Sequence, residues 1–145
     1  MNKILIFVAS AFLASASWAN DSIQGTKWKT IDDKTGKPKF LIEIKKVKDN
    51  IYNGSIVDVF DLENKLTCKS CNGRLMGKRL QGTTVINSLK VVESGKFKDG
   101  KILDPDSGRI YSLEGELVEN GKKLRLRGYL GISALDRSQT WLRVN

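Results

Sequence analysis

Two cysteines, Cys68 and Cys71 in the segment CKSC, are the residues whose type and spacing most directly suggest chemistry. A zinc site needs four ligands, and a chain with two cysteines and no histidine does not supply the usual set. A redox-active dithiol needs a helix N-terminus in a βαβ setting, and no such pattern surrounds the segment. We therefore predict no metal site and a structural disulfide formed in an oxidising compartment, with redox activity as the alternative.

Two pairs of carboxylates could be considered for acid–base catalysis. Asp104 and Asp106 flank a proline in DPDSG, where turn formation explains each residue type. Glu114 and Glu116 lie in a segment of alternating apolar and charged residues, 111–130. The chain has no histidine to act as a general base and no nucleophile or phosphate-binding motif. We predict that the protein is not an enzyme and uses no cofactor.

The segment 111–130 is predicted to be a β-hairpin with a type I′ turn at Asn120 and Gly121. That turn fixes the register, so the two glutamates face two arginines on the outer side of the barrel. The predicted ion pairs are Glu116 with Arg125 and Glu114 with Arg127. The inner pairs are Leu117 with Leu124, Gly115 with Leu126, Leu113 with Gly128 and Tyr111 with Leu130.

Gly115 and Gly128 leave two places on this inner face without a side chain. A glycine inside a strand often marks the close approach of a bulky group. We expect a tryptophan to fill the space, with a ligand as the alternative.

The remaining chain shows period-2 alternation broken by turn residues, which predicts an all-β fold of about eight strands. The alternating segments are 25–31, 39–47, 51–60, 96–104 and 138–144. A polar loop is predicted over 61–73, and the stretch 74–93 is less regular.

The N-terminal residues 1–19 resemble a signal peptide, with Lys3, an apolar run over 4–13 and a small-x-small cleavage site before Asn20. That run is about half of the roughly 20 residues that cross a bilayer, so no transmembrane span is expected. The mature protein is then a single domain, 20–145, and we predict a periplasmic location. An N-terminal anchor is the alternative.

The formal net charge of +9 favours anionic partners. Nucleic acid is not expected for an exported chain, so anionic envelope components are the partners that this charge suggests. The basic residues are scattered through every segment, and ordinary solubility charge is the alternative explanation.

Gly25 and Trp28 open the first predicted strand, and Trp141 and Arg143 lie in the last. These fragments resemble lipocalins and related calycin barrels, which begin with a Gly-x-Trp strand whose tryptophan closes the barrel floor beneath a basic residue. The resemblance implies a floor made by Trp28, Trp141 and Arg143, with a cation–π contact. Two unrelated core tryptophans are the alternative.

The fragments GTKWKTIDDKTGKP, DPDSGRIYS, LRLRGYLG and RSQTWLRV together resemble an exported bacterial family known as domain of unknown function 2147. The resemblance implies a lipocalin-like barrel and no particular reaction. The chain departs from the family pattern at Lys98–Gly100, before the Asp-Pro turn. The matching positions are Trp28, Asp104, Pro105, Gly108, Tyr111, Arg127, Gly128, Tyr129, Arg137, Gln139, Trp141 and Arg143.

A barrel of eight strands is wide enough to hold one small ligand or to be filled by side chains. We predict a periplasmic carrier or sensor of a small apolar or amphipathic molecule, acting as a monomer or weak dimer. The alternative is a filled barrel that serves as an envelope-associated interaction module, with Arg127, Tyr129 and the cysteine loop on its surface. The predicted cavity residues are Phe40, Ile42, Ile44, Tyr111, Leu113, Leu124 and Leu126.

Overall fold

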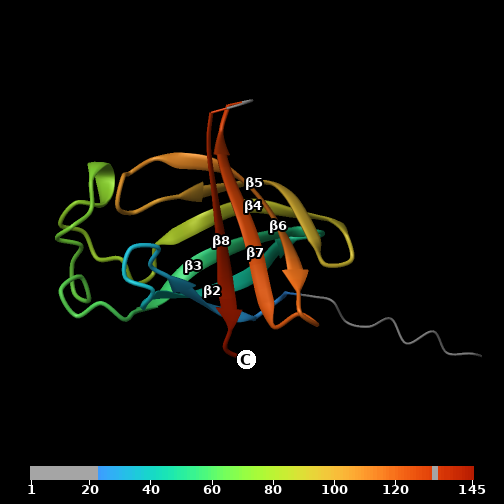
Figure 1. Cartoon of the computed structure of the whole chain (residues 1–145), viewed down its shortest axis with the longest axis horizontal. Helices are drawn as coiled ribbons and strands as arrows, with labels where there is room; N and C mark the ends of the chain where they lie inside the picture. Colours follow the sequence, from blue (N-terminus) through green and yellow to red (C-terminus); the bar gives the residue numbers. More distant parts are fainter. Residues whose placement is uncertain (1–22, 132–133) are drawn as a thin grey trace, which may run out of the picture.

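The computed structural model describes residues 23–131 and 134–145 (Figure 1). The predicted signal peptide, 1–19, lies outside these residues. The prediction of about eight strands is confirmed. The elements are β1 (Lys27–Ile31), β2 (Pro38–Lys48), β3 (Ile51–Val59), the 3₁₀ turn η1 (Gly73–Leu75), β4 (Thr84–Glu93), β5 (Lys96–Leu103), β6 (Ile110–Val118), β7 (Lys123–Leu130) and β8 (Ala134–Arg143).

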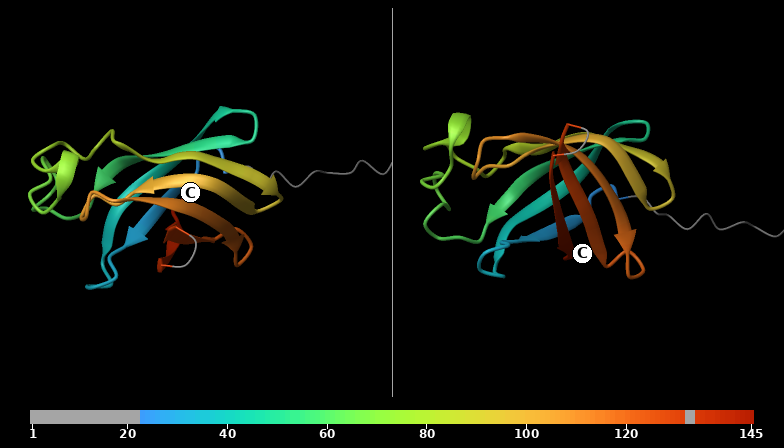
Figure 2. Two further views of the ribbon diagram at one scale, coloured as in Figure 1. Left: turned by 90° about the horizontal axis from the view of Figure 1, so that it is seen from above. Right: turned by 45° about the horizontal axis from the view of Figure 1, so that its top comes forward.

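The eight strands form a closed antiparallel barrel in which each strand pairs with the next along the chain. The barrel, drawn as a ribbon in Figures 1 and 2, closes where β8 pairs with β1. In this pairing Trp28 lies opposite Arg143. Closure satisfies the backbone hydrogen bonds that an open sheet leaves unpaired at its edges. The predicted all-β antiparallel barrel is therefore the fold of this chain.

The core lies inside the barrel and is built by the alternation that the sequence shows. On β2, Phe40, Ile42 and Ile44 are buried, and the residues between them are only partly buried. Successive side chains of a strand point to opposite faces, so this period places one row inside.

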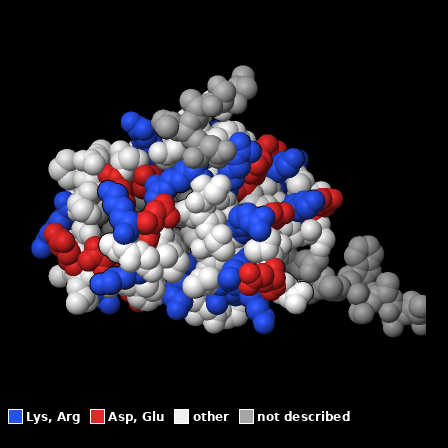
Figure 3. Space-filling model, viewed as in Figure 1, with Lys and Arg blue, Asp and Glu red and all other residues white. Residues whose placement is uncertain are grey.

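The hairpin of β6 and β7 has the predicted register. Asn120 and Gly121 have φ of 56° and 78°, as a type I′ turn requires, and the amide of Lys122 donates to the carbonyl of Glu119 at 3.1 Å. Arg125 lies 2.8 Å from Glu116, and Arg127 lies 3.2 Å from Glu114. Basic and acidic side chains accordingly lie next to one another on the outer wall (Figure 3).

The space at the two glycines of this hairpin is not filled by a tryptophan, so that prediction was wrong. A Cβ on Gly115 would lie 2.6 Å from Cδ2 of Leu126, and a Cβ on Gly128 would lie 3.4 Å from Cβ of Tyr111. Neighbours on the adjacent positions therefore occupy both gaps.

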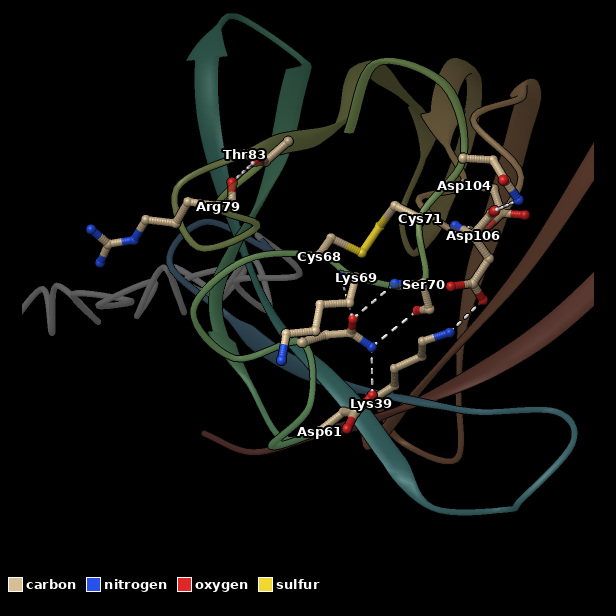
Figure 4. The surroundings of a disulfide bond; sticks show 12 residues. Lys39, Asp61, Cys68, Lys69, Ser70, Cys71, Arg79, Thr83, Asp104 and Asp106 are labelled. Carbon is tan, nitrogen blue, oxygen red and sulfur yellow. Dashed lines mark hydrogen bonds and ion pairs between the residues drawn. A yellow bond between two sulfur atoms is a disulfide. The ribbon is translucent and has the colours of Figure 1, made fainter. Parts of the chain in front are cut away.

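A long loop, 60–83, joins β3 to β4 and carries the disulfide between Cys68 and Cys71, which confirms the predicted pairing (Figure 4). The irregular stretch predicted over 74–93 divides at residue 84, where β4 begins. The short turn η1 lies in this loop, and no helix among the described residues is long and apolar enough to cross a membrane.

Candidate functional site: a cavity at one end of the barrel

One end of the barrel is closed by Trp28, whose side chain is fully buried. Its indole N–H donates to the hydroxyl of Thr26 at 2.8 Å, and that hydroxyl donates to the carbonyl of Ile23 at 2.6 Å. The guanidinium carbon of Arg143 lies 5.8 Å from the centre of the Trp28 ring, within cation–π range. Trp28 and Arg143 thus form the floor that the sequence predicted.

The other half of the barrel contains a cavity of about 100 Å³. Its walls come from both ends of the chain and from the middle, because the strands of a closed barrel all face one interior. The apolar wall includes Phe40, Ile42, Val85, Leu113, Leu126 and Trp141.

The structure brings most of the predicted cavity residues together around this space. Phe40, Ile42, Tyr111, Leu113 and Leu126 line it. The other two predicted residues, Ile44 and Leu124, are fully buried in the core but do not line the cavity.

Trp141, the third residue of the predicted floor, contributes to the cavity wall. It lines the cavity, whereas Trp28 and Arg143 do not. Its indole N–H donates to Oε1 of Gln139 at 3.0 Å, and Gln139 also lines the cavity. Trp141 is therefore a wall residue of the cavity, and it belongs to the same buried core cluster as Trp28.

The mouth of the cavity is crossed by two cations that join the β1–β2 turn to the β5–β6 turn. Lys39 pairs with Asp32 at 3.5 Å and also with Asp106. The two turns belong to strands on opposite sides of the eight-stranded barrel. Lys39 therefore connects opposite sides of the mouth. Figure 4 shows its ion pair with Asp106.

Arg137 repeats the same connection from β8. Its Nη2 lies 2.7 Å from Oδ2 of Asp33, and its Nη1 lies 3.4 Å from Oδ2 of Asp104. Asp33 also accepts a hydrogen bond from the Gln139 amide at 3.2 Å, which continues the network inward to Trp141. We call the six residues Asp32, Asp33, Lys39, Asp104, Asp106 and Arg137 the mouth ion-pair cluster.

Two pKa shifts reflect this arrangement. The backbone N–H of Thr35 lowers the pKa of Asp32, against some burial, with help from the N–H of Lys34 and the charge of Lys39. Burial by itself lowers the pKa of Arg137, but the hydrogen bond and charge of Asp33, together with the charge of Asp104, outweigh it and raise that pKa. Both shifts favour the charged form, so Asp32 and Arg137 are charged at neutral pH.

Tyr111 adds a polar group to the cavity wall. No described residue forms a hydrogen bond with its hydroxyl, although the group is close enough to Arg137 to influence the arginine electrostatically. The cavity thus combines apolar walls with one available hydroxyl and a charged mouth.

Sequence reasoning did not place the mouth ion-pair cluster at the cavity. Asp104 and Asp106 were explained as turn residues, and Arg137 was noted only as a position of the family resemblance. The signal that could have found the cluster is that Asp33, Asp104 and Arg137 each lie in a fragment of the family resemblance, namely GTKWKTIDDKTGKP, DPDSGRIYS and RSQTWLRV.

A closed antiparallel barrel with a buried tryptophan floor and a small cavity above it defines a lipocalin-like protein. Protein HP1028 from Helicobacter pylori, described as belonging to the lipocalin family, has a similar structure with a TM-score of 0.68 and 18% sequence identity. The similarity covers 86% of this chain and 84% of that one. It concerns the fold alone.

The family itself follows from the sequence. The profile described as "Uncharacterized protein conserved in bacteria (DUF2147)" matches residues 26–143, and the chain belongs to this family. The comparison with curated proteins finds no match.

Proposed function

We propose that this protein binds one small amphipathic molecule in the barrel and carries or senses it without chemical change. The observation that carries the proposal is the cavity of about 100 Å³, with apolar walls and a charged mouth. An apolar cavity of about 150 Å³ holds benzene, and a water needs only about 10–15 Å³. The space therefore suits an apolar group of a few carbon atoms.

The polar groups suggest how such a molecule lies. Its apolar part contacts Leu113 and Trp141, and its polar end meets the hydroxyl of Tyr111 and the mouth ion-pair cluster. A cavity of this size also argues against a barrel filled throughout by side chains. The apolar wall, the Tyr111 hydroxyl and the mouth ion-pair cluster are sufficient to recognise such a molecule, so the proposed role is that of a binding protein.

We further propose that the protein acts in the periplasm. The signal-like residues 1–19 and the disulfide between Cys68 and Cys71 support export to an oxidising compartment.

The proposal is tested by titration with short alkanoates, alkanols and alkylamines of increasing chain length. Trp141 reports binding through its fluorescence because it lines the cavity. We expect saturable binding with a maximum at a chain of a few carbons, and the three head groups identify the preferred charge. Native mass spectrometry of protein from its natural host would identify the physiological ligand.

Val85→Phe is the decisive variant, because Val85 is a buried wall residue of the cavity. The phenyl ring of the introduced side chain would fill the space. We expect this variant to weaken binding at least tenfold, because the ring excludes the ligand sterically. A tenfold loss corresponds to about 1.4 kcal/mol of binding free energy. Val92→Phe makes the same change at an exposed position away from the cavity and should leave binding unchanged. Equal binding by both variants would place the ligand elsewhere.

A further inference from the structure

The loop 60–83 exposes several large apolar side chains that the barrel does not use. Leu62 is 83% exposed, Leu66 is 82% exposed and Met76 is 62% exposed. Single exposed apolar residues are common on soluble proteins and need no explanation. Three of them within one loop indicate a surface that contacts something apolar.

This exposure does not come from a loop without structure. Leu75 and Leu80 are buried and anchor the loop to the core. The buried side chain of Asn64 accepts hydrogen bonds from the amides of Lys69 and Ser70 at 2.8 and 3.1 Å. Together with the disulfide, these contacts anchor the loop, although Leu62 and Leu66 remain exposed to solvent.

The loop also carries cations without carboxylate partners. It contains five Lys or Arg residues and two Asp or Glu residues. Lys65 pairs with Asp58 at 3.7 Å. In the described part of the chain, the other four cations of the loop have no carboxylate partner, in contrast to Arg125 and Arg127 on the barrel wall. These four are Lys69, Arg74, Lys78 and Arg79.

We propose that the loop 60–83 docks the protein on an anionic lipid bilayer. Exposed leucine and methionine side chains enter the boundary between head groups and acyl chains, and nearby cations attract anionic head groups. A stable protein–protein interface needs about 800 Å² of continuous surface on each partner. Separate exposed apolar side chains in a loop with an excess of cations suit a bilayer better.

The loop lies beside the mouth of the cavity. The backbone N–H of Asn72 and its side-chain amide both donate to the carbonyl of Asp106, at 3.2 and 2.8 Å, and Asp106 lines the cavity. A docked loop therefore holds the mouth near the head groups, where an amphipathic ligand can be exchanged. This exchange rests on the proposed function, whereas the docking itself does not.

The test is co-sedimentation of the protein with vesicles of phosphatidylcholine, with or without phosphatidylglycerol. We expect binding to the vesicles that contain phosphatidylglycerol, weak binding to the others, and a decrease with added salt. Leu62→Ser combined with Leu66→Ser should weaken binding roughly tenfold or more, because two apolar side chains leave the bilayer. Circular dichroism checks that this surface variant folds.

Val47→Ser combined with Val92→Ser is the matched control, since both valines are exposed, by 54% and 46%, near turns at the opposite end of the barrel. We expect this control to bind vesicles like the unchanged protein. Lys69→Gln and Lys78→Gln should each weaken binding about fivefold.

Equal binding by the two serine variants would overturn the proposal, as would absence of binding to both kinds of vesicle. Self-association that disappears in the Leu62→Ser, Leu66→Ser variant, without vesicle binding, would instead identify an interface between copies of this chain. Val85→Phe separates the two proposals, because it blocks the cavity and should leave vesicle binding intact.

Discussion

The two ends of the barrel are held together in different ways. At the closed end, Trp28 bonds to Thr26, two residues away, and the indole is sealed from solvent. At the open end, Arg137 bonds to Asp33 across 104 residues of sequence, and both side chains remain partly exposed. One end is closed by packing, and the other is crossed by charges.

Because of this difference, one end of the barrel contributes to the stability of the fold and the other controls access of a ligand to the cavity. Burial of a large aromatic side chain contributes several kcal/mol, whereas an exposed ion pair contributes about 0–1 kcal/mol. The mouth can therefore rearrange at little cost while the floor stays fixed. A binding protein of the proposed kind needs this combination, because the ligand must pass the mouth without unfolding the barrel.

The largest effect is expected from truncation of Trp28 in the floor. Trp28→Ala should lower the free energy of unfolding by about 3–5 kcal/mol, because a fully buried indole leaves a cavity. Urea denaturation measures this change. Arg137→Gln at the mouth should cost less than about 1 kcal/mol. Similar losses for the two variants would contradict the division between packed and charged ends.

The contact between Trp28 and Arg143 can be measured separately by a double-mutant cycle. Trp28→Phe and Arg143→Ala should show a coupling energy of about 0.5–2 kcal/mol, since the guanidinium lies over the ring. Strict additivity would mean that the contact contributes nothing and that burial alone holds the floor.

A third prediction compares two positions on the inner face of β2. Ile42 and Ile44 are both buried, but only Ile42 lines the cavity. Ile44→Phe should cost about 1–3 kcal/mol by overpacking a filled core. Ile42→Phe should cost clearly less, because the ring can enter the cavity. Equal costs in urea denaturation would show that the cavity does not accept a larger side chain.

The sequence was informative about local features. Alternation placed the strands, and the Asn120–Gly121 turn fixed the register of β6 and β7 and thereby its two ion pairs. Cys68 and Cys71 could be paired because the chain offers no other thiol. These features depend on residues that are close in sequence.

The depth of a residue along the barrel axis could not be predicted in the same way. A period of two tells which face a side chain takes but not how far along the barrel it lies. Trp141 was therefore assigned to the floor, although it lines the cavity, and Ile44 and Leu124 were assigned to a cavity that they do not reach.

The mouth ion-pair cluster was missed for a related reason. Asp33 and Asp104 lie in turns, where an aspartate has a local explanation. Their shared partner, Arg137, becomes visible only when the barrel closes and brings distant turns to one place. Partner choice among many exposed charges is a property of the closed fold.

The smallest expected effect concerns pH and again contrasts the two ends. The pKa of Asp32, at the mouth, is lowered chiefly by the N–H of Thr35, so its folded value lies below its ordinary value of 3.8. A carboxylate of this kind stabilises the fold fully above its unfolded pKa, and this contribution is lost as pH falls from about 4 through the folded pKa. Asp32→Asn should therefore cost less than about 1 kcal/mol at neutral pH and nothing in strong acid.

Glu93, near the opposite end, is the control for Asp32. The pKa of Glu93 is also lowered, by the hydrogen bond and then the charge of Lys96, and both side chains are exposed. Salt should screen this pair, whereas the backbone hydrogen bonds to Asp32 should persist in salt. Urea denaturation of Asp32→Asn and Glu93→Gln, from neutral pH to strong acid and at low and high salt, measures both effects. A stability difference between Asp32→Asn and the unchanged protein that stays constant from neutral pH into strong acid would show that the carboxylate charge of Asp32 does not hold its turn. The β1–β2 turn at the mouth would then be fixed by backbone geometry rather than by this charge.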